Sequence, residues 1–140
     1  MRIGILSLAL VCFGTVAQAD VRSLTEINAE RSANGRSVLT YDRRLEKAAQ
    51  MHASDMANRG FFSHTGSDGS DVRHRLKRAG YKYCVAAENI AWGQKSRAGV
   101  MNGWMNSKGH RKNILNHKVK SVGLAEASGG HWVMVLAAPC

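Results

Sequence analysis

Residues 119–138 have the sequence VKSVGLAEASGGHWVMVLAA, and this stretch decides the fold class. Ser128-Gly129-Gly130 is a turn signal between two apolar segments, so it predicts a β-hairpin. The two strands are expected over residues 119–127 and 131–138, and the second is apolar on both faces. The chain should therefore end in an antiparallel pair of strands.

Four helices are predicted ahead of this hairpin, each beginning at a residue that favours a helix N-terminus. The expected N-terminal residues are Ser23, Asp42, Asp71 and Ser96, and the first three helices should stop at Gly35, Gly60 and Gly80. A further short apolar strand is expected from Ala86 to Trp92. Helices that come first and a hairpin that comes last indicate an α+β sandwich, with a sheet covered by helices.

The first nineteen residues predict a cleavable secretory signal. Arg2 supplies a positive charge, residues 3–16 are uncharged and mostly apolar, and Ala17-Gln18-Ala19 is a pattern that signal peptidase accepts. The apolar run is shorter than the roughly 18 residues of a membrane span, and no later segment is apolar enough to be one. We expect residues 1–19 to be removed, and residues 20–140 to form one domain that is secreted or periplasmic.

Charge and cysteine content narrow the class of protein further. The net charge of +10 falls by one when Arg2 leaves, and such a balance favours contact with an anionic surface. The basic residues are scattered, which disfavours a specific nucleic-acid site. Cys12 is lost with the signal, so Cys84 and Cys140 remain as an even pair in an oxidising compartment. A Cys84–Cys140 disulfide is therefore predicted.

Three segments place an ionisable group beside residues that favour burial. They are residues 61–64 (FFSH), residues 87–91 (AENIA) and residues 104–115 (WMNSKGHRKNIL). Glu88 has apolar neighbours in a predicted strand, and a buried carboxylate must be paired or neutralised. Histidines are its natural partners. Asn89, also in this strand, is expected to hydrogen-bond loop backbone.

In this order and with this spacing, the three segments resemble the CAP superfamily. That superfamily contains cysteine-rich secretory proteins, venom-type antigens and plant pathogenesis-related proteins, and the small bacterial members are the most similar. Val122-Gly123 and His131-Trp132-Val133 complete the series, so the resemblance extends from Leu24 to Ala138. It implies an α-β-α three-layer sandwich with a central antiparallel sheet.

The resemblance also implies a cleft that holds two histidines and two acidic residues. His64, Glu88 and His110 match three of these by position, whereas Ser107 stands where the second acid would be. Two imidazoles and one carboxylate are the ligand set of some catalytic zinc sites, yet they can equally form a hydrogen-bond network that shapes a cleft. A Zn or Mg ion held by His64, Glu88 and His110 is the less favoured alternative, because no second acid or His-Glu-x-x-His helix supports it.

The remaining histidines and tryptophans are expected to be structural. His52 lies on the apolar face of a predicted helix and should be a core histidine, whereas His131 is expected at the surface. The tryptophans are expected in the core rather than as platforms for a ligand; they are Trp92, Trp104 and Trp132.

Three classes of function remain for the cleft. A binding module for a lipid, a sterol or another envelope component ranks first, and an extracellular protein whose basic face contacts an anionic surface ranks second. A hydrolase or protease, acting directly or through a metal, ranks third, because no nucleophile elbow surrounds Ser63 or Ser107. An enzymatic role is disfavoured but left open, no cofactor is firmly implied, and a monomer is expected.

Overall fold

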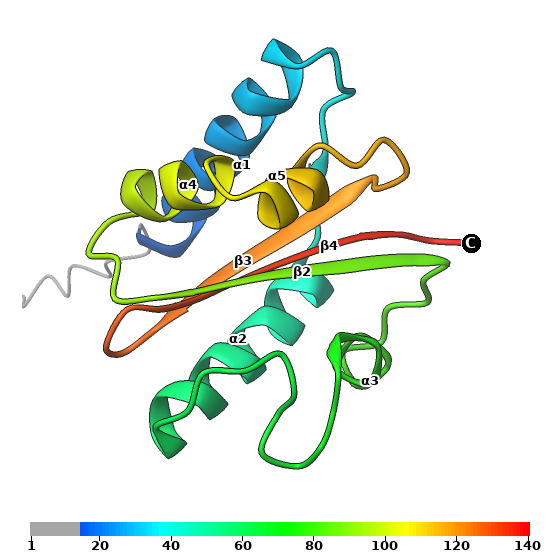
Figure 1. Cartoon of the computed structure of the whole chain (residues 1–140). Helices are drawn as coiled ribbons and strands as arrows, with labels where there is room; N and C mark the ends of the chain where they lie inside the picture. Colours follow the sequence, from blue (N-terminus) through cyan, green and yellow to red (C-terminus); the bar gives the residue numbers. More distant parts are fainter. Residues whose placement is uncertain (1–14) are drawn as a thin grey trace, which may run out of the picture.

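The structure is a computed structural model that describes residues 15–140, with side chains from Val21 onward. Helices cover both faces of a four-stranded sheet of order β1-β3-β4-β2 (Figure 1). The elements are α1 (Thr15–Ala33), β1 (Thr40–Tyr41), α2 (Arg43–Arg59), α3 (Val72–Arg78), β2 (Val85–Trp92), α4 (Arg97–Met105), α5 (Lys108–Ile114), β3 (Ser121–Ala127) and β4 (His131–Ala138). Helices α1, α4 and α5 form one outer layer, and α2 and α3 form the other.

Helix α1 begins earlier than the sequence predicted. It starts at Thr15, so Ser23 lies inside the helix and the expected cap at Ser23 is wrong. Residues 15–22 contain no glycine or proline and include two alanines, which favour helix, so the helix continues back past Ser23. Its C-terminal end is followed, as expected, by Gly35 with a left-handed backbone. Residues 1–14, most of the predicted signal, lie outside the described residues.

The central strand β4 explains why the sandwich has two cores. Alternate residues of a strand point to opposite faces of the sheet. Trp132, Met134 and Leu136 join the core under α1, α4 and α5, whereas Val133 and Val135 join the core over α2. A strand that is apolar on both faces is thereby buried on both faces, and the predicted three-layer sandwich is confirmed.

The sheet is mixed rather than wholly antiparallel. β2 and β3 both pair antiparallel with β4, as the sequence predicted. β1 pairs parallel with β3, with Thr40 opposite Ser121, so the expectation of an antiparallel sheet is wrong for this strand. β1 has only two residues, too few to show a strand pattern in the sequence.

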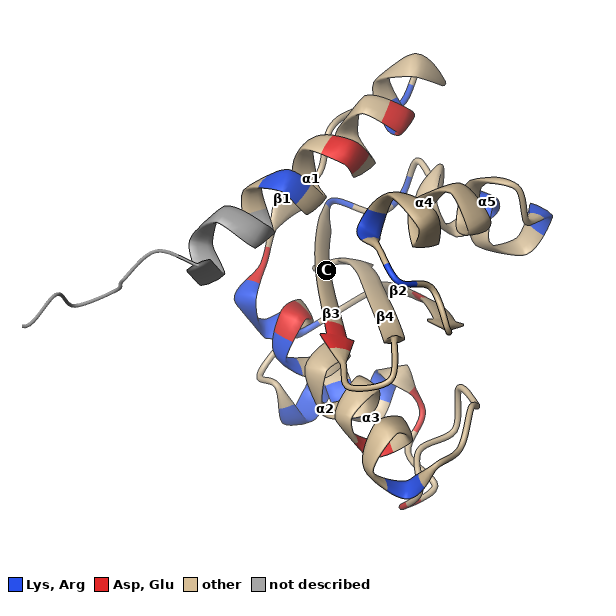
Figure 2. Cartoon of the chain, turned by 90° about the vertical axis from the view of Figure 1, so that its left-hand side faces the viewer, with Lys and Arg blue, Asp and Glu red and all other residues tan. Residues whose placement is uncertain are grey.

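Lys and Arg positions are spread over helices of both outer layers (Figure 2). Within residues 15–140, no helix is both long enough and apolar enough to cross a membrane.

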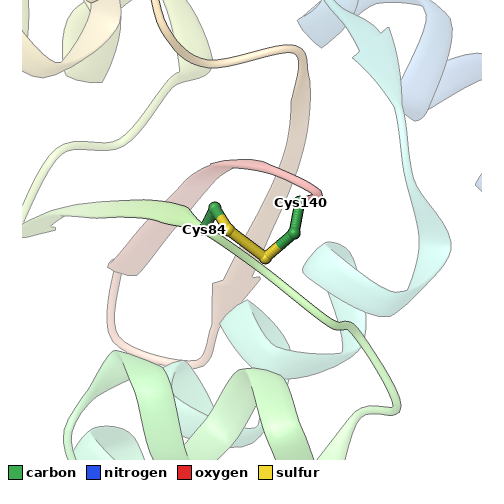
Figure 3. Close-up of a disulfide and its surroundings, with 2 residues drawn as sticks. All are labelled: Cys84 and Cys140. Atoms are coloured by element: carbon green, nitrogen blue, oxygen red, sulfur yellow. A yellow bond between two sulfur atoms is a disulfide. The ribbon is translucent and has the colours of Figure 1, made fainter.

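The predicted disulfide is present, and it joins β2, along whose edge the site described below lies, to the neighbouring strand β4. Cys84 directly precedes β2 and Cys140 lies two residues beyond β4 (Figure 3). Their Cα atoms are 4.8 Å apart, and the N–H of Cys84 donates to the carbonyl of Ala138. The bond therefore closes one end of the β2–β4 ladder.

Helix α2 packs against β3 so closely that Gly123 leaves no room for a side chain. A Cβ at this position would lie 2.1 Å from the backbone nitrogen of Glu46 and 2.4 Å from the carbonyl carbon of Leu45. We expect Gly123→Ala to lower the free energy of unfolding by about 3 kcal/mol, the upper end for overpacking, because backbone atoms cannot rotate away. Urea denaturation of the two proteins measures this difference.

The matched control is Gly109→Ala in α5. An added Cβ there meets no atom within 4 Å. Alanine favours helix over glycine by up to about 1 kcal/mol, so this variant should be as stable as the wild type or more so. Equal stabilities for Gly123→Ala and Gly109→Ala would show that α2 and β3 are not in this close contact.

Candidate functional site

The candidate site lies along the edge of the sheet formed by β2. Among the described strands, β2 pairs with β4 on one side only. Two side chains from the α4–α5 region satisfy carbonyls of this strand. Trp104 Nε1 donates to the carbonyl of Ile90 (3.2 Å), and Asn113 Nδ2 donates to that of Glu88 (3.3 Å). The segment after α2 approaches the same strand from the other layer, so segments of both layers meet there.

Glu88 is the buried centre of a charged network. Its Oε1 lies 2.8 Å from His64 Nδ1, and its Oε2 accepts a hydrogen bond from Arg75 Nη2 at 2.8 Å. The side chains of Glu88 and Arg75 are each only 3% exposed. Arg75 also donates to the carbonyls of Ser70 and His64. One guanidinium therefore neutralises the carboxylate and fixes the backbone of the histidine beside it.

His64 is the exposed member of this network. Its side chain is 60% exposed, although its Nδ1 is held by the buried Glu88. A carboxylate paired with arginine can only accept hydrogen bonds, so the Nδ1–H of His64 must donate. In the neutral imidazole, Nε2 then carries the lone pair. The network therefore presents one oriented imidazole at the surface.

His110 faces the site from α5. Asn89 is fully buried and donates to the His110 carbonyl at 3.1 Å, and it accepts from Asn113 at 2.9 Å. Burial lowers the pKa of His110, and the nearby His64 lowers it further. Its ring lies 6.5 Å from that of Trp104, centroid to centroid. His110 is therefore tied to β2 through Asn89, and its lowered pKa favours the neutral imidazole.

A hollow of about 340 Å³ lies beside this network. His110 and Ser107 line it, whereas the buried Glu88 does not. Ser107 occupies the N-cap position of α5 but makes no side-chain capping bond. The structure thus joins His64 directly to Glu88, places His110 and Ser107 in the wall of the hollow, and uses Asn89 to connect β2 with α5.

The three predicted ligands do not fit a bound Zn or Mg ion in this arrangement. Both oxygens of Glu88 are engaged, and one of them is held by the cationic Arg75, which opposes a second positive charge. Among the residues with described side chains, no group of three or more His, Cys, Asp or Glu is placed to hold a metal ion.

Sequence reasoning missed Arg75 and misplaced two aromatic residues. Trp92 is 60% exposed, so the prediction that it lies in the core is wrong, whereas Trp104 and Trp132 are buried as expected. His131 is buried against Trp92, with their rings stacked 5.5 Å apart, so the surface prediction for His131 is wrong. Trp92 is the last residue of β2, and its side chain is exposed at that end of the strand.

A usable signal for Arg75 was present in the helix pattern. It lies three residues after Val72 and four before Ala79, on the same helical face as the apolar residues. A charged residue on such a face needs a buried partner, and Glu88 was the buried acid without an assigned cation.

His52 is the core histidine that its helical position predicted, and it makes stability depend on pH. Its Nε2–H donates to the carbonyl of Ser63 at 2.7 Å, and its Nδ1 is buried without a partner among the described residues. Burial lowers the pKa of His52, and Arg75 lowers it further, against the opposing effects of Glu88 and Asp55. The neutral imidazole makes no ion pair with Glu88, although their nearest atoms are 3.9 Å apart.

We expect the free energy of unfolding to fall as the pH decreases from about 6.5 towards the folded-state pKa of His52. Between these two pH values the unfolded chain binds more protons than the folded chain. The stability that the neutral His52 contributes is therefore fully present above about pH 6.5, and it is lost as the pH falls through this window, by up to about 1.4 kcal/mol per pH unit. Urea denaturation across pH 5–7 measures the slope. His52→Gln should reduce it, leaving the contribution of His110, whereas the exposed His117→Gln should not. An unchanged slope in His52→Gln would contradict this assignment.

Comparisons of the chain with known proteins agree on one protein family. The model of the cysteine-rich secretory protein family, abbreviated CAP, matches residues 24–137. The uncharacterized protein YkwD of Bacillus subtilis (strain 168) is 39% identical over 103 residues, which are 74% of this chain and 40% of YkwD. The uncharacterized membrane protein YlbC of the same strain is 30% identical over 79% of this chain and 31% of its own. The chain thus spans less than half of either relative.

Solved structures show the same fold. An extracellular protein of Bacillus anthracis str. Ames that contains an SCP domain has a TM-score of 0.78 at 27% identity, over 86% of this chain and 42% of that one. An outer surface protein of Borrelia burgdorferi has a TM-score of 0.79 at 20% identity, over 91% of this chain and 97% of that one. The second likeness concerns the fold alone.

Proposed function

The chain belongs to the cysteine-rich secretory protein (CAP) family and carries an extracellular-type domain, and from this premise we propose that it is an exported binding module. The proposed ligand site is the hollow beside β2, and the ligand is a component of the cell envelope, a class that includes lipids and sterols. One observation carries the proposal: the hollow is walled by Phe62 and Trp92, two large apolar side chains that are 48% and 60% exposed. Exposed aromatic side chains beside a hollow are typical of a binding site.

The state of Glu88 favours binding over hydrolysis. A general base must reach the proton that it removes, within hydrogen-bond distance or through one water molecule. Glu88 is buried, and each of its oxygens already has a partner. In this arrangement its role is to orient His64 rather than to activate water itself.

Hydrolysis is the second candidate, and the geometry of His64 is the observation that favours it. An imidazole oriented by a carboxylate through Nδ1 has Nε2 available as a general base. Turnover of a peptide or ester substrate that disappears in Glu88→Gln, with the fold intact by circular dichroism, would favour this candidate. Metal titration of the wild type and His64→Ala tests the Zn or Mg alternative, and equal uptake by both would remove it.

Filling the hollow tests the binding proposal. Gly103 lies in α4 and lines the hollow, and an added Cβ there meets no atom within 4 Å. Gly103→Tyr should therefore occupy the site without disturbing the core, and Gly109→Tyr, on α5, is the matched control. Each protein is incubated with an envelope extract, and the retained molecules are identified by mass spectrometry. We expect at least tenfold less ligand on Gly103→Tyr, about 1.4 kcal/mol, and an unchanged amount on Gly109→Tyr. Equal retention by both variants would exclude the hollow as the site.

Export is the second part of the proposal. The basis is the predicted signal, with cleavage after Ala19, and the extracellular nature of the solved relative from Bacillus anthracis. This position lies within α1, so the cut must precede folding of that helix. Mass spectrometry of the exported protein should find Asp20 as its first residue, and a species that retains Met1 or Arg2 would contradict cleavage.

A further inference from the structure

Trp92 presents a rigid aromatic face. One side of its ring stacks on His131, with an interplanar angle of 16° and centroids 5.5 Å apart. His131 is itself fixed, because its Nδ1 hydrogen-bonds the carbonyl of Ser128 at 2.9 Å. The ring of Phe62 lies 6.4 Å from that of Trp92 and is tilted by 34°. A ring that is stacked on one side and yet 60% exposed offers its other face to a ligand.

The flat face of a sugar ring complements such a surface. The π-face of an aromatic ring is electron-rich, so it attracts groups of partial positive charge. One face of a pyranose ring presents several C–H bonds of this kind, whereas its hydroxyl groups project from the rim. A ligand that stacks on Trp92 in this way needs hydrogen-bonding partners close to the aromatic wall.

Polar groups of the hollow supply these partners. The Oε1 of Gln94 and the Nδ1 of His110 are buried and have no hydrogen-bond partner among the described residues. Both side chains line the hollow, together with Ser107, whose hydroxyl is not used to cap α5. A ligand that carries hydroxyl groups can supply the hydrogen-bond partner that these two atoms lack. A hydrocarbon chain supplies no such partner, whereas a hydroxyl group can donate or accept a hydrogen bond.

The charge around the hollow favours an acidic ligand. Lys95 directly follows Gln94 and Lys108 directly follows Ser107, and both lysines are exposed. No Asp or Glu lines this hollow, and the carboxylate of Glu88 is neutralised by Arg75. The chain as a whole carries a net charge of +10. Two exposed lysines next in sequence to lining residues, with no acid in the lining, favour carboxylate or phosphate groups over cations.

From these observations we infer that the ligand of the hollow is an acidic polysaccharide. A sugar ring stacks on Trp92, its hydroxyl groups bond Gln94, Ser107 and His110, and its carboxylate or phosphate lies near Lys95 and Lys108. The inference rests on the proposed binding function and names the class of ligand for the same site.

Affinity electrophoresis and calorimetry with defined polymers test this inference. Polygalacturonate carries carboxylates, phosphomannan carries phosphates, and dextran is a neutral control. We expect one of the two acidic polymers to bind at least tenfold more tightly than dextran, and the tighter one identifies the acidic group. Failure of both acidic polymers to bind would overturn the inference.

Variants of the aromatic face separate stacking from charge attraction. Trp92→Ala should weaken binding at least tenfold, whereas Trp92→Phe, which keeps a ring, should bind within about threefold of the wild type. Val38→Ala removes an equally exposed apolar side chain elsewhere and should bind like the wild type. Polymer binding that is unchanged in Trp92→Ala, with the fold verified by circular dichroism, would overturn the stacked arrangement.

The two lysines have their own matched control. The double variant Lys95→Gln/Lys108→Gln should bind the acidic polymer several-fold more weakly than the wild type at low salt, and its binding should depend less on salt concentration. The pair Lys47→Gln and Lys118→Gln makes the same charge change at exposed positions that do not adjoin a lining residue in the sequence, and it should have less effect. Equal losses from the two pairs would reduce the charge effect to net charge and contradict the assigned positions.

Lipid vesicles and the Gly103→Tyr variant distinguish a failure of the inferred ligand class from a failure of the proposed binding function. Binding to phosphatidylglycerol vesicles that depends on Trp92 and exceeds binding to both polymers would make lipid the occupant and overturn the inference. If no acidic polymer binds but Gly103→Tyr still loses an envelope ligand, the binding function stands and the polysaccharide assignment fails. If Gly103→Tyr loses nothing, the binding function fails as well.

Discussion

Replacing Arg75 with methionine is expected to lower the free energy of unfolding by about 3–5 kcal/mol, the cost of breaking a buried ion pair from one side. Methionine has similar length but no charge, so it leaves the carboxylate of Glu88 buried with only His64 as a partner. The carbonyls of Ser70 and His64 lose their arginine donors at the same time. Urea denaturation at pH 7 measures the loss.

Two further variants show whether the charge or the shape of Arg75 is responsible. Arg73→Met changes an exposed arginine on the same helix and should cost less than about 0.5 kcal/mol. Adding Glu88→Gln to Arg75→Met removes the uncompensated charge and should recover about 2 kcal/mol by coupling between contacting residues. If the double variant is no more stable than Arg75→Met alone, packing rather than the ion pair explains the loss.

Local signals in the sequence predicted most of the helices and strands correctly. Asp42 and Asp71 accept hydrogen bonds from the first turns of α2 and α3, as their cap positions indicated. Gly60 ends α2 with a left-handed backbone. These features depend on residues within a few positions of one another, so a single sequence contains the information. The continuous apolar run that identifies β4, and the Gly-Gly turn before it, are equally local.

Elements without such signals were missed. Helix α5 has seven residues, no side-chain cap and a glycine in its first turn, so its sequence is a poor isolated helix. It forms because Ile114 is buried in the core and Asn113 bonds β2. Those contacts are tertiary, and the pattern of residues 108–114 cannot reveal them.

In the candidate site, too, the sequence predicted what depends on local signals and missed what depends on tertiary contacts. The sequence identified Glu88 as a buried acid that needs a partner, and His64 is one of its partners. It did not identify Arg75, which reaches Glu88 from α3. It also did not identify the exposure of Trp92, which follows from the position of β2 at the edge of the sheet. Both depend on which segments meet at that edge. The ligand class that we infer rests on these two unforeseen features.

Removal of the Cys84–Cys140 disulfide is expected to lower the free energy of unfolding by about 4 kcal/mol. The two cysteines are 56 residues apart, so the bond closes a long loop in the unfolded chain and lowers its entropy. Urea denaturation of the oxidised wild type and of Cys84→Ser/Cys140→Ser measures the difference. Wild type treated with dithiothreitol should behave like the double variant.

The effect should arise in the unfolded state and not at the site. Without the bond, β2 and β4 remain paired through an uninterrupted register from Val85 opposite Ala138 to Trp92 opposite His131. The denaturant slope m should therefore rise, because the unlinked chain exposes more surface when it unfolds. Ligand affinity at low denaturant should stay within about twofold of the wild type, since Trp92 lies at the opposite end of the ladder from Cys84. A large loss of affinity with an unchanged m would show instead that the disulfide holds β2 in its binding position.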